Sequence, residues 1–143
     1  MTVERDGAAR WFSRVTWIGV AANLALAVPT LIAPERMAAF ARVPEPDPLL
    51  WLRFAALLLI LLSAFYVPAA LDPVRYRVVA WLAVGARLAG VVFFVLFQPA
   101  AYHMFGYFDL VFFVPEFALL VRIRRSEPQA PAIASLPVPG SVR

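Results

Sequence analysis

The segment FAALLLILLSAFYVPAAL, residues 54–71, decides the fold class, because it carries no charge between Arg53 and Asp72. A helix needs about 20 mainly apolar residues to cross the hydrocarbon core of a bilayer. The apolar residues of this segment are continuous, whereas those of a helix on the surface of a soluble protein form a stripe. The segment therefore predicts a membrane-spanning helix over about residues 49–71.

Three further apolar stretches of similar length predict spans over about residues 12–33, 77–98 and 104–122. The 143-residue chain is 63% hydrophobic and 15% charged, with a mean hydropathy of +0.79. Average soluble domains are about 45–50% apolar and about 25% charged. We therefore predict an all-α integral membrane protein, a four-helix bundle in which residues 1–125 form one four-span membrane domain.

The segment after the first span predicts a short external helix. Met37, Phe40 and Ala41 recur there at helical spacing, with Arg36 and Arg42 as the polar residues beside them. A short amphipathic helix of this kind lies in the plane of the membrane surface. We therefore expect a short amphipathic helix on the outer surface, directly after the first span.

Proline decides what the other connecting segments are. The alternating prolines of residues 44–48 exclude a helix and predict a stiff, extended connector. Leu71-Asp72-Pro73 predicts a tight turn, so that the second and third spans form an antiparallel hairpin. Residues 126–143 are rich in proline and poor in large apolar residues, which predicts a disordered cytoplasmic tail.

The arginines predict the orientation in the membrane. With four spans, nine of the 13 basic residues fall on the side that holds both termini and the second loop: Arg5, Arg10, Arg14, Arg75, Arg77, Arg122, Arg124, Arg125 and Arg143. The opposite side holds only Arg36, Arg42 and Arg53. Because cytoplasmic loops carry the excess of basic residues, we expect a multi-pass protein of the bacterial inner membrane with both termini in the cytoplasm.

Missing residue types exclude several kinds of chemistry. The chain has no cysteine, which excludes disulfides, thiolate metal sites and iron–sulfur clusters within it. It has no lysine and a single histidine, His103, which excludes Schiff-base chemistry and a haem held by two imidazoles. There is no metal-ligand spacing and no nucleophile–base pair, and the arginines are too scattered to bind nucleic acid. The sequence leaves enzymatic activity open, favours a non-enzymatic protein, and predicts no metal site and no nucleic-acid partner.

Charged residues inside the predicted spans are the main functional clue. Arg87 lies ten residues after Arg77, about 15 Å along the third span. In the fourth span, Glu116 and Asp109 lie about 9 Å and about 20 Å from the boundary residue Arg122. Arg87 is therefore at a depth between the two carboxylates and within reach of either. We expect a buried ion-pair cluster.

Polar residues form stripes on three of the four spans. Residues seven or eleven positions apart share one helix face. The stripes are Thr16, Asn23 and Thr30; Arg87 and Gln98; and, if the last helix begins early enough to include Tyr102, also Tyr102, Asp109 and Glu116. Such stripes turn away from lipid and toward other helices. The predicted cluster in the shared interior therefore consists of Arg87, Glu116, Asp109 and Asn23.

A second set of residues, at the outer end, is a candidate ligand or proton path: Tyr102, His103, Gln98 and Arg53. His103 is either a solvated or interface-packed side chain or part of a pH-sensitive group with Tyr102 and Asp109. Arg53 either extends outward to water or approaches Asp109. For the buried cluster, a structural ion pair, a proton or ligand site, and a contact with a partner subunit all remain open.

Two short strings and one charge carry a family resemblance. Trp51-Leu52-Arg53-Phe54 opens the second span, Ala70-Leu71-Asp72-Pro73 forms the turn after it, and Arg87 follows in the third span. With four spans and an external segment after the first, the chain resembles the DoxX-like group of small bacterial membrane proteins. The resemblance implies a partner or subunit of a membrane redox complex, including quinone-linked ones. It transfers no catalytic residue.

Three functions follow from these observations. The first is a non-catalytic accessory subunit of a larger membrane complex, with a quinone-linked redox complex as one candidate. The second is a small proton-coupled carrier, acting as a homodimer, that uses Arg87 with Glu116 or Asp109. The third is a binder of lipid or another apolar ligand, since the phenylalanines of the last two spans suit a flat molecule such as a quinone. No cofactor is required, and the expected partners are membrane lipid and other membrane subunits or further copies of the chain.

Overall fold

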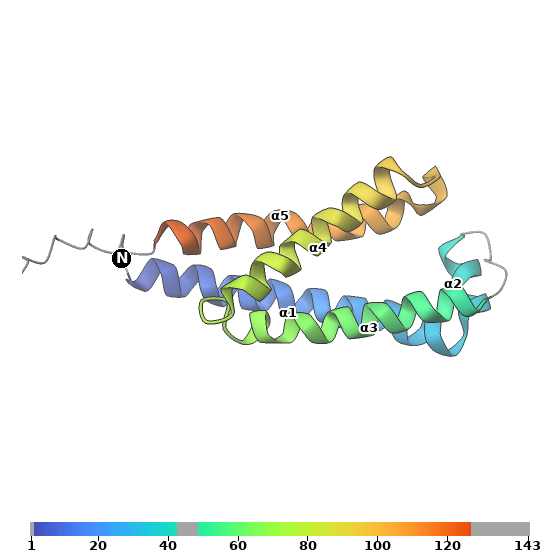
Figure 1. The fold of residues 1–143 in the computed structure, drawn as a ribbon, viewed down its shortest axis with the longest axis horizontal. Coiled ribbons are helices and arrows are strands. Elements are labelled where there is room, and N and C mark those ends of the chain that lie inside the picture. The colour runs from blue at the N-terminus through green and yellow to red at the C-terminus, as the bar shows by residue number, and fades with distance from the viewer. Residues whose placement is uncertain (1, 43–48, 127–143) are drawn as a thin grey trace, which may run out of the picture.

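The computed structural model of the chain describes residues 2–42 and 49–126, and in these ranges every regular element is a helix (Figure 1). The elements are α1 (Thr2–Ile32), α2 (Pro34–Ala41), α3 (Leu50–Leu71), α4 (Arg77–Leu96), the 3-10 turn η1 (Ala100–Tyr102) and α5 (His103–Arg125). The helices α1, α3, α4 and α5 are long and apolar enough to cross a membrane. The predicted all-helical class and four helices of membrane-spanning length are thus confirmed.

The helix bounds differ from the predicted spans at several ends. Helix α1 begins ten residues earlier than the apolar stretch, because hydropathy locates the part that suits a bilayer and not the whole helix. Helix α4 ends at Leu96, two residues early, since Gln98 precedes Pro99 and is thereby disfavoured in helical conformation. The predicted extended connector, residues 44–48, lies outside the described residues. So does the predicted tail, residues 126–143, except for Ser126.

The four long helices pack as two pairs, α1 along α3 and α4 along α5. Contacts between α1 and α5 join the pairs, whereas α3 and α4 touch less extensively although they are consecutive in the chain. Figure 1 shows the two pairs close together near the N-terminus and spread apart toward α2. We call these two ends of the molecule the closed end and the open end.

A core of small and medium side chains fills the closed end. It consists of Phe12, Ala69, Ala80, Val84, Leu120 and Ile123, each at most 2% exposed. Ala69 belongs to α3 and Ala80 to α4. Because the alanine side chain is a single methyl group, both helices can pack closely against their neighbours. The Ser13 hydroxyl adds a hydrogen bond to the Ala70 carbonyl, which ties α1 to the end of α3.

The turn between α3 and α4 forms as its sequence predicts. Asp72 ends α3, and its Oδ1 accepts hydrogen bonds from the amides of Val74 at 3.0 Å and Arg75 at 2.9 Å. An aspartate before proline favours this turn, because its side chain replaces backbone acceptors while proline cannot continue the helix. The turn starts α4 next to α3 at the closed end, and α4 then diverges to pair with α5.

Helix α2 follows α1 after a single residue, Ala33, and contacts α1 at the open end. Pro34 occupies its first turn, where the missing amide hydrogen is harmless, and Arg42 ends it with φ of 54°. Ala38 is buried, but Phe40 is 80% exposed. The helix expected after the first span is therefore present, and its placement on a membrane surface stays a prediction.

Candidate functional site

Arg87 of α4 is the centre of the candidate site. Its residue surface is only 2% exposed, although it lies among apolar helices. An isolated charge at the centre of a membrane helix costs about 2.5–3.5 kcal/mol on insertion scales. A buried guanidinium is therefore expected only where neighbouring groups compensate its charge and its five N–H donors.

Two carboxylates of α5 provide the charge. Arg87 Nη1 lies 3.0 Å from Asp109 Oδ1, and Arg87 Nε lies 3.8 Å from Glu116 Oε2. The Asp109 side chain is 22% exposed, whereas that of Glu116 is 1% exposed. We call these three side chains the charge cluster. The guanidinium is thus hydrogen-bonded to the more accessible carboxylate and only loosely paired with the more deeply buried one.

Several buried polar atoms around the guanidinium have no hydrogen-bond partner within the described ranges. They are Arg87 Nε and Nη2, Glu116 Oε1 and the Thr16 hydroxyl. Thr16 of α1 is a close neighbour of the Glu116 carboxylate. Because buried polar groups are nearly always hydrogen-bonded, the Glu116 side of the cluster retains donors and acceptors that a rearranged guanidinium can satisfy.

Helices α1 and α3 extend the cluster into a polar network. Asn23 Oδ1 lies 3.4 Å from Arg87 Nη1, and Asn23 Nδ2 donates to Ser63 Oγ at 3.2 Å. Ser63 in turn donates to the Leu59 carbonyl at 2.7 Å. The network therefore contains side chains from all four long helices, and it joins the two helix pairs where they begin to separate.

Two aromatic rings cover the guanidinium. Arg87 Cζ lies 4.7 Å from the centroid of the Phe112 ring and 5.4 Å from that of Tyr66. Both distances allow cation–π attraction, which is strongest where water is excluded. Sequence reasoning missed Tyr66 and Ser63, although they are the only polar side chains in residues 54–71 and their i, i+3 spacing puts them on one helix face.

Two glycines make room for the charge cluster. A Cβ atom at Gly19 would collide with the Arg87 guanidinium and lie 3.3 Å from the Phe112 ring. A Cβ atom at Gly90 would collide with the Asp109 carboxylate. Gly90 forms a small-residue pair with Ala86, of the kind that usually lets two helices approach closely. The structure shows that the space is filled by a side chain.

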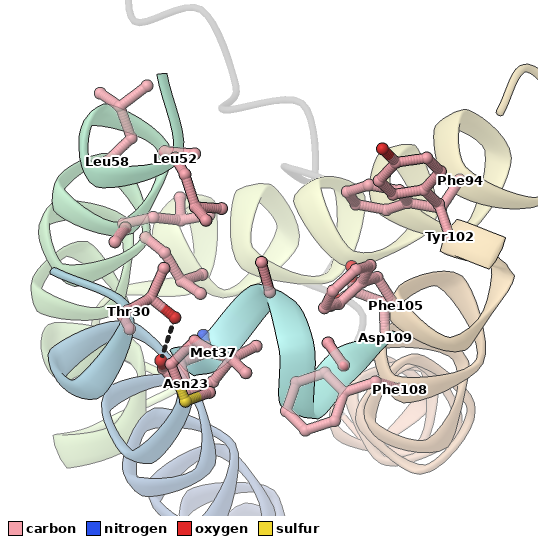
Figure 2. A pocket seen from close by; sticks show the side chains of 18 of the residues that line it. Asn23, Thr30, Met37, Leu52, Leu58, Phe94, Tyr102, Phe105, Phe108 and Asp109 are labelled. Atoms are coloured by element: carbon pink, nitrogen blue, oxygen red, sulfur yellow. Dashed lines mark hydrogen bonds between the residues drawn. The ribbon is translucent and has the colours of Figure 1, made fainter. Parts of the chain in front are cut away.

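An apolar cleft of about 540 Å³ opens between the helix pairs at the open end. Figure 2 shows aromatic side chains on the α4–α5 side and aliphatic side chains on the α1–α3 side, with Met37 of α2 between them. The aromatic side chains on the α4–α5 side are Phe94, Tyr102, Phe105 and Phe108, and Trp51 of α3 adds one aromatic ring to the opposite side. Asn23 and Asp109 also line the cleft, so its wall includes two members of the polar network.

The cleft has the dimensions and chemistry of a small-molecule site. Such sites occupy about 300–1,000 Å³ and combine apolar walls with a few polar groups that orient the ligand. The arrangement suits a molecule with a hydrocarbon or aromatic body that fills the cleft and a polar group that reaches Asp109. Within residues 2–42 and 49–126, no group of three or more His, Asp or Glu side chains is placed to hold a metal ion.

The structure brings together only part of the predicted outer path. Tyr102 precedes α5, within η1, and lines the cleft. Gln98 lies beyond the end of α4, so it does not share a helix face with Arg87 as its spacing suggested. Its carbonyl lies 3.1 Å from His103 Nε2, and the imidazole ring packs edge-on against Tyr107. Arg53 is exposed near the start of α3, while Asp109 pairs with Arg87.

No protein-family model, curated protein or solved structure matches this chain. The DoxX-like resemblance therefore remains a prediction from the sequence. Function has to be argued from the cleft and the charge cluster.

Proposed function

We propose that this chain is a multi-pass protein of the bacterial inner membrane that binds a lipophilic small molecule in the cleft between its helix pairs. The observation that carries the proposal is the cleft itself, whose apolar walls end at a buried ionised network. A cleft lined only by hydrocarbon would suit a lipid tail, but the contact with Asp109 and Asn23 selects molecules that also carry a polar group.

The distribution of arginines supports the orientation with both termini in the cytoplasm. The closed end gathers the start of α1, the α3–α4 turn and the end of α5 (Figure 1). It carries Arg10, Arg14, Arg75, Arg77, Arg122, Arg124 and Arg125, whereas the open end carries Arg36, Arg42 and Arg53. Under the positive-inside rule, the cleft opens toward the outer side of the membrane.

Cysteine labelling tests this orientation on a chain that has no cysteine of its own. Ala101→Cys at the open end is expected to react with a membrane-impermeant maleimide in intact cells. Ser126→Cys at the closed end is expected to react only after the membrane is permeabilised. The opposite pattern would reverse the proposed topology.

A cleft-filling substitution tests ligand binding. Ala55 of α3 lines the cleft, and Ala55→Trp places a large ring in the binding volume. Ala64 is also exposed on α3 but is not among the cleft-lining residues, so Ala64→Trp is the matched control. Binding of 1-adamantanol, measured by equilibrium dialysis of the purified protein, should be lost in Ala55→Trp and kept in Ala64→Trp. Equal binding by the two variants would place the ligand elsewhere.

A carrier is the second candidate function. It is favoured by one observation, the packed core of the closed end, which blocks the cleft on one side and leaves it accessible on the other. Alternation between this arrangement and its inverse would move a ligand across the membrane. Uptake of a labelled ligand into proteoliposomes under an imposed pH gradient tests it, and binding without uptake would limit the protein to binding.

The accessory-subunit role predicted from the sequence is compatible with the same site. A subunit of a larger membrane complex, quinone-linked or not, would hold its lipophilic ligand in the cleft and present it to a partner. Native purification in mild detergent tests this role. Recovery of the protein only as a monomer or homo-oligomer would remove it.

A further inference from the structure

The charge cluster contains one more carboxylate than it has cations. Asp109 and Glu116 both pair with Arg87, so the fully ionised cluster carries a net charge of −1. An uncompensated charge in an apolar interior is strongly unfavourable. The cluster therefore requires one further positive charge, either a proton on one carboxylate or a cation from outside.

Only one of the two carboxylates is accessible from the cleft. Asp109 lines it and its side chain is 22% exposed, whereas Glu116 is 1% exposed and is not among the lining residues. Figure 2 shows Asp109 on the wall next to Phe105 and Phe108. A cation that enters the cleft therefore meets Asp109, and a proton is the charge that suits Glu116.

The polar groups of the cleft also favour a ligand that donates hydrogen bonds. The Asn23 amide donates to Ser63, and the Thr30 hydroxyl donates to the Leu26 carbonyl at 2.7 Å. Both groups already donate one hydrogen bond, and the other donors that line the cleft, the Tyr102 hydroxyl and the Trp51 indole N–H, are uncharged. The Asp109 carboxylate is an acceptor with more lone pairs than Arg87 uses. A quinone carbonyl or a carboxylate ligand would place a second acceptor against it, so this part of the wall favours an ammonium group.

We propose that the cleft binds a lipophilic ammonium compound in exchange for one proton. The inference rests on the proposed function, because it names the ligand class of the same cleft. The hydrocarbon body lies between the aromatic and aliphatic walls, and the ammonium N–H groups donate to Asp109. The aromatic rings of Phe105 and Phe108 add cation–π attraction.

Arg87 moves from one carboxylate to the other in this exchange. Before binding, Arg87 donates to Asp109 while Glu116 carries the proton, and the cluster is neutral. After binding, the ammonium occupies Asp109, Arg87 donates through Nε and Nη2 to Glu116, and the Glu116 proton leaves for bulk water. The cluster is again neutral, since two cations face two carboxylates. The unpartnered Nε, Nη2 and Glu116 Oε1 are the atoms that this second arrangement pairs.

The groups that face Glu116 are few. In the described part of the chain, the titratable or charged ones are Tyr66 from α3, Arg87 from α4 and Asp109 from its own helix. Helix α1 contributes the neutral Thr16 hydroxyl. A proton released from this cluster on ligand binding is therefore assigned to Glu116.

Three probes of one shape test the ligand class: 1-adamantylammonium, 1-adamantanol and adamantane-1-carboxylate. A hydrogen bond to a charged group contributes more binding free energy than one between neutral groups. The difference predicts that the ammonium binds about tenfold more tightly than the alcohol and that the carboxylate binds most weakly. Asp109→Asn should abolish the preference for the ammonium over the alcohol. Glu35→Gln, which removes an exposed carboxylate of α2, should preserve the preference.

Calorimetry in buffers of different ionisation enthalpy tests the exchange. Wild-type protein should release close to one proton for each 1-adamantylammonium bound and none for 1-adamantanol. Glu116→Gln, which mimics the protonated carboxylate, should bind the ammonium more weakly and release no proton. Release that persists in Glu116→Gln, or no release from the wild type, would overturn the exchange.

The outcomes separate this inference from the proposed function. Equal affinity for the three probes, or the tightest binding by the carboxylate, would overturn the ammonium assignment and leave the cleft as an apolar binding site. Failure of all three probes to bind would overturn both.

Discussion

The two ends of the molecule are built from the same four helices but differ in how closely those helices approach. At the closed end, Ala69 and Ala80 are fully buried in one packed cluster with Phe12 and Leu120. At the open end, phenylalanines and leucines line a cleft that they do not fill. Small side chains at the closed end allow the helices to approach closely. They do not close the helices by themselves, since Ala27, Ala55 and Ala56 line the cleft at the open end.

The polar network lies at the level where closed packing gives way to the cleft. Asn23, Ser63 and Arg87 connect α1, α3 and α4, and the two carboxylates add α5. Hydrogen bonds and ion pairs between helices hold them at a fixed separation, because each needs its donor and acceptor within about 3 Å. The comparison therefore predicts that the closed end sets stability and that the network sets the opening of the cleft.

Removal of Arg87 is expected to have the largest effect. Arg87→Ala leaves two carboxylates buried without a cation, and breaking such a pair lowers the free energy of unfolding by about 3–5 kcal/mol. Arg53→Ala, which removes an exposed arginine near the start of α3, is the control and should change nothing measurable. Reversible unfolding in mixed micelles measures both. A similar stability of the two variants would show that the network does not join the helix pairs.

The same enlargement at the two ends tests the comparison directly. Ala80→Leu inserts three carbons into the packed core, and overpacking of this kind costs about 1–3 kcal/mol of unfolding free energy. Ala55→Leu adds the same atoms beside the cleft, where space is available, and should leave stability unchanged. Thermal unfolding in detergent ranks the two variants, and an equal loss would mean that the open end is packed as tightly as the closed end.

Two glycines of α4 provide a finer test. Gly90→Ala brings a methyl group against the Asp109 carboxylate, so the carboxylate must shift and its hydrogen bond with Arg87 is weakened. Partial loss of a charged hydrogen bond costs about 1 kcal/mol of unfolding free energy. At Gly85 an added Cβ meets nothing within 4 Å. Gly85→Ala should therefore increase stability slightly through helix propensity. If Gly90→Ala stabilises the protein as much as Gly85→Ala does, the proposed role of that space is wrong.

The smallest expected effect is the coupling between Asn23 and Ser63. Hydrogen bonds between membrane helices contribute about 0.6 kcal/mol on average in double-mutant cycles. A cycle of Asn23→Ala and Ser63→Ala should give a coupling energy of that size. A cycle of Asn23→Ala with Ser126→Ala, at the far end of α5, should give none. A zero result for the first cycle would remove α3 from the network.

Sequence reasoning located the helices well because hydropathy depends on composition over long windows. The apolar run of residues 54–71 is long enough to span a membrane and carries no charge. Three further apolar stretches of similar length predict the other three helices that are apolar enough to span a membrane. The predicted helix ends were less accurate, because helix ends depend on local residues. Helix α4 ends at Leu96 because Pro99 disfavours helical conformation at the preceding residue. Pairing was predictable in part, because α1 with α3 and α4 with α5 are consecutive spans, whereas α3 and α4, which the sequence predicted to form a hairpin, touch less extensively.

The centre of the candidate site was predictable because charged residues inside apolar helices are rare and need partners. Arg87, Asp109 and Glu116 are such residues, and the structure brings them together. The cleft was not predictable, since it arises where two helix pairs diverge and no local sequence pattern records that angle. The assignment of Gln98 to the face of Arg87 failed because it assumed a helix that continued past Leu96.

The position of Arg87 has a consequence for biosynthesis under the proposed membrane topology. Arg87 is made 22 residues before Asp109, so α4 reaches the insertion machinery before its counter-charges exist. A central arginine disfavours release of a lone helix into lipid by about 2.5–3.5 kcal/mol. We therefore expect α4 to wait at the translocon and to enter the bilayer together with α5, as one hairpin. A nascent chain truncated before α5 should remain there and be recognised by quality-control proteases.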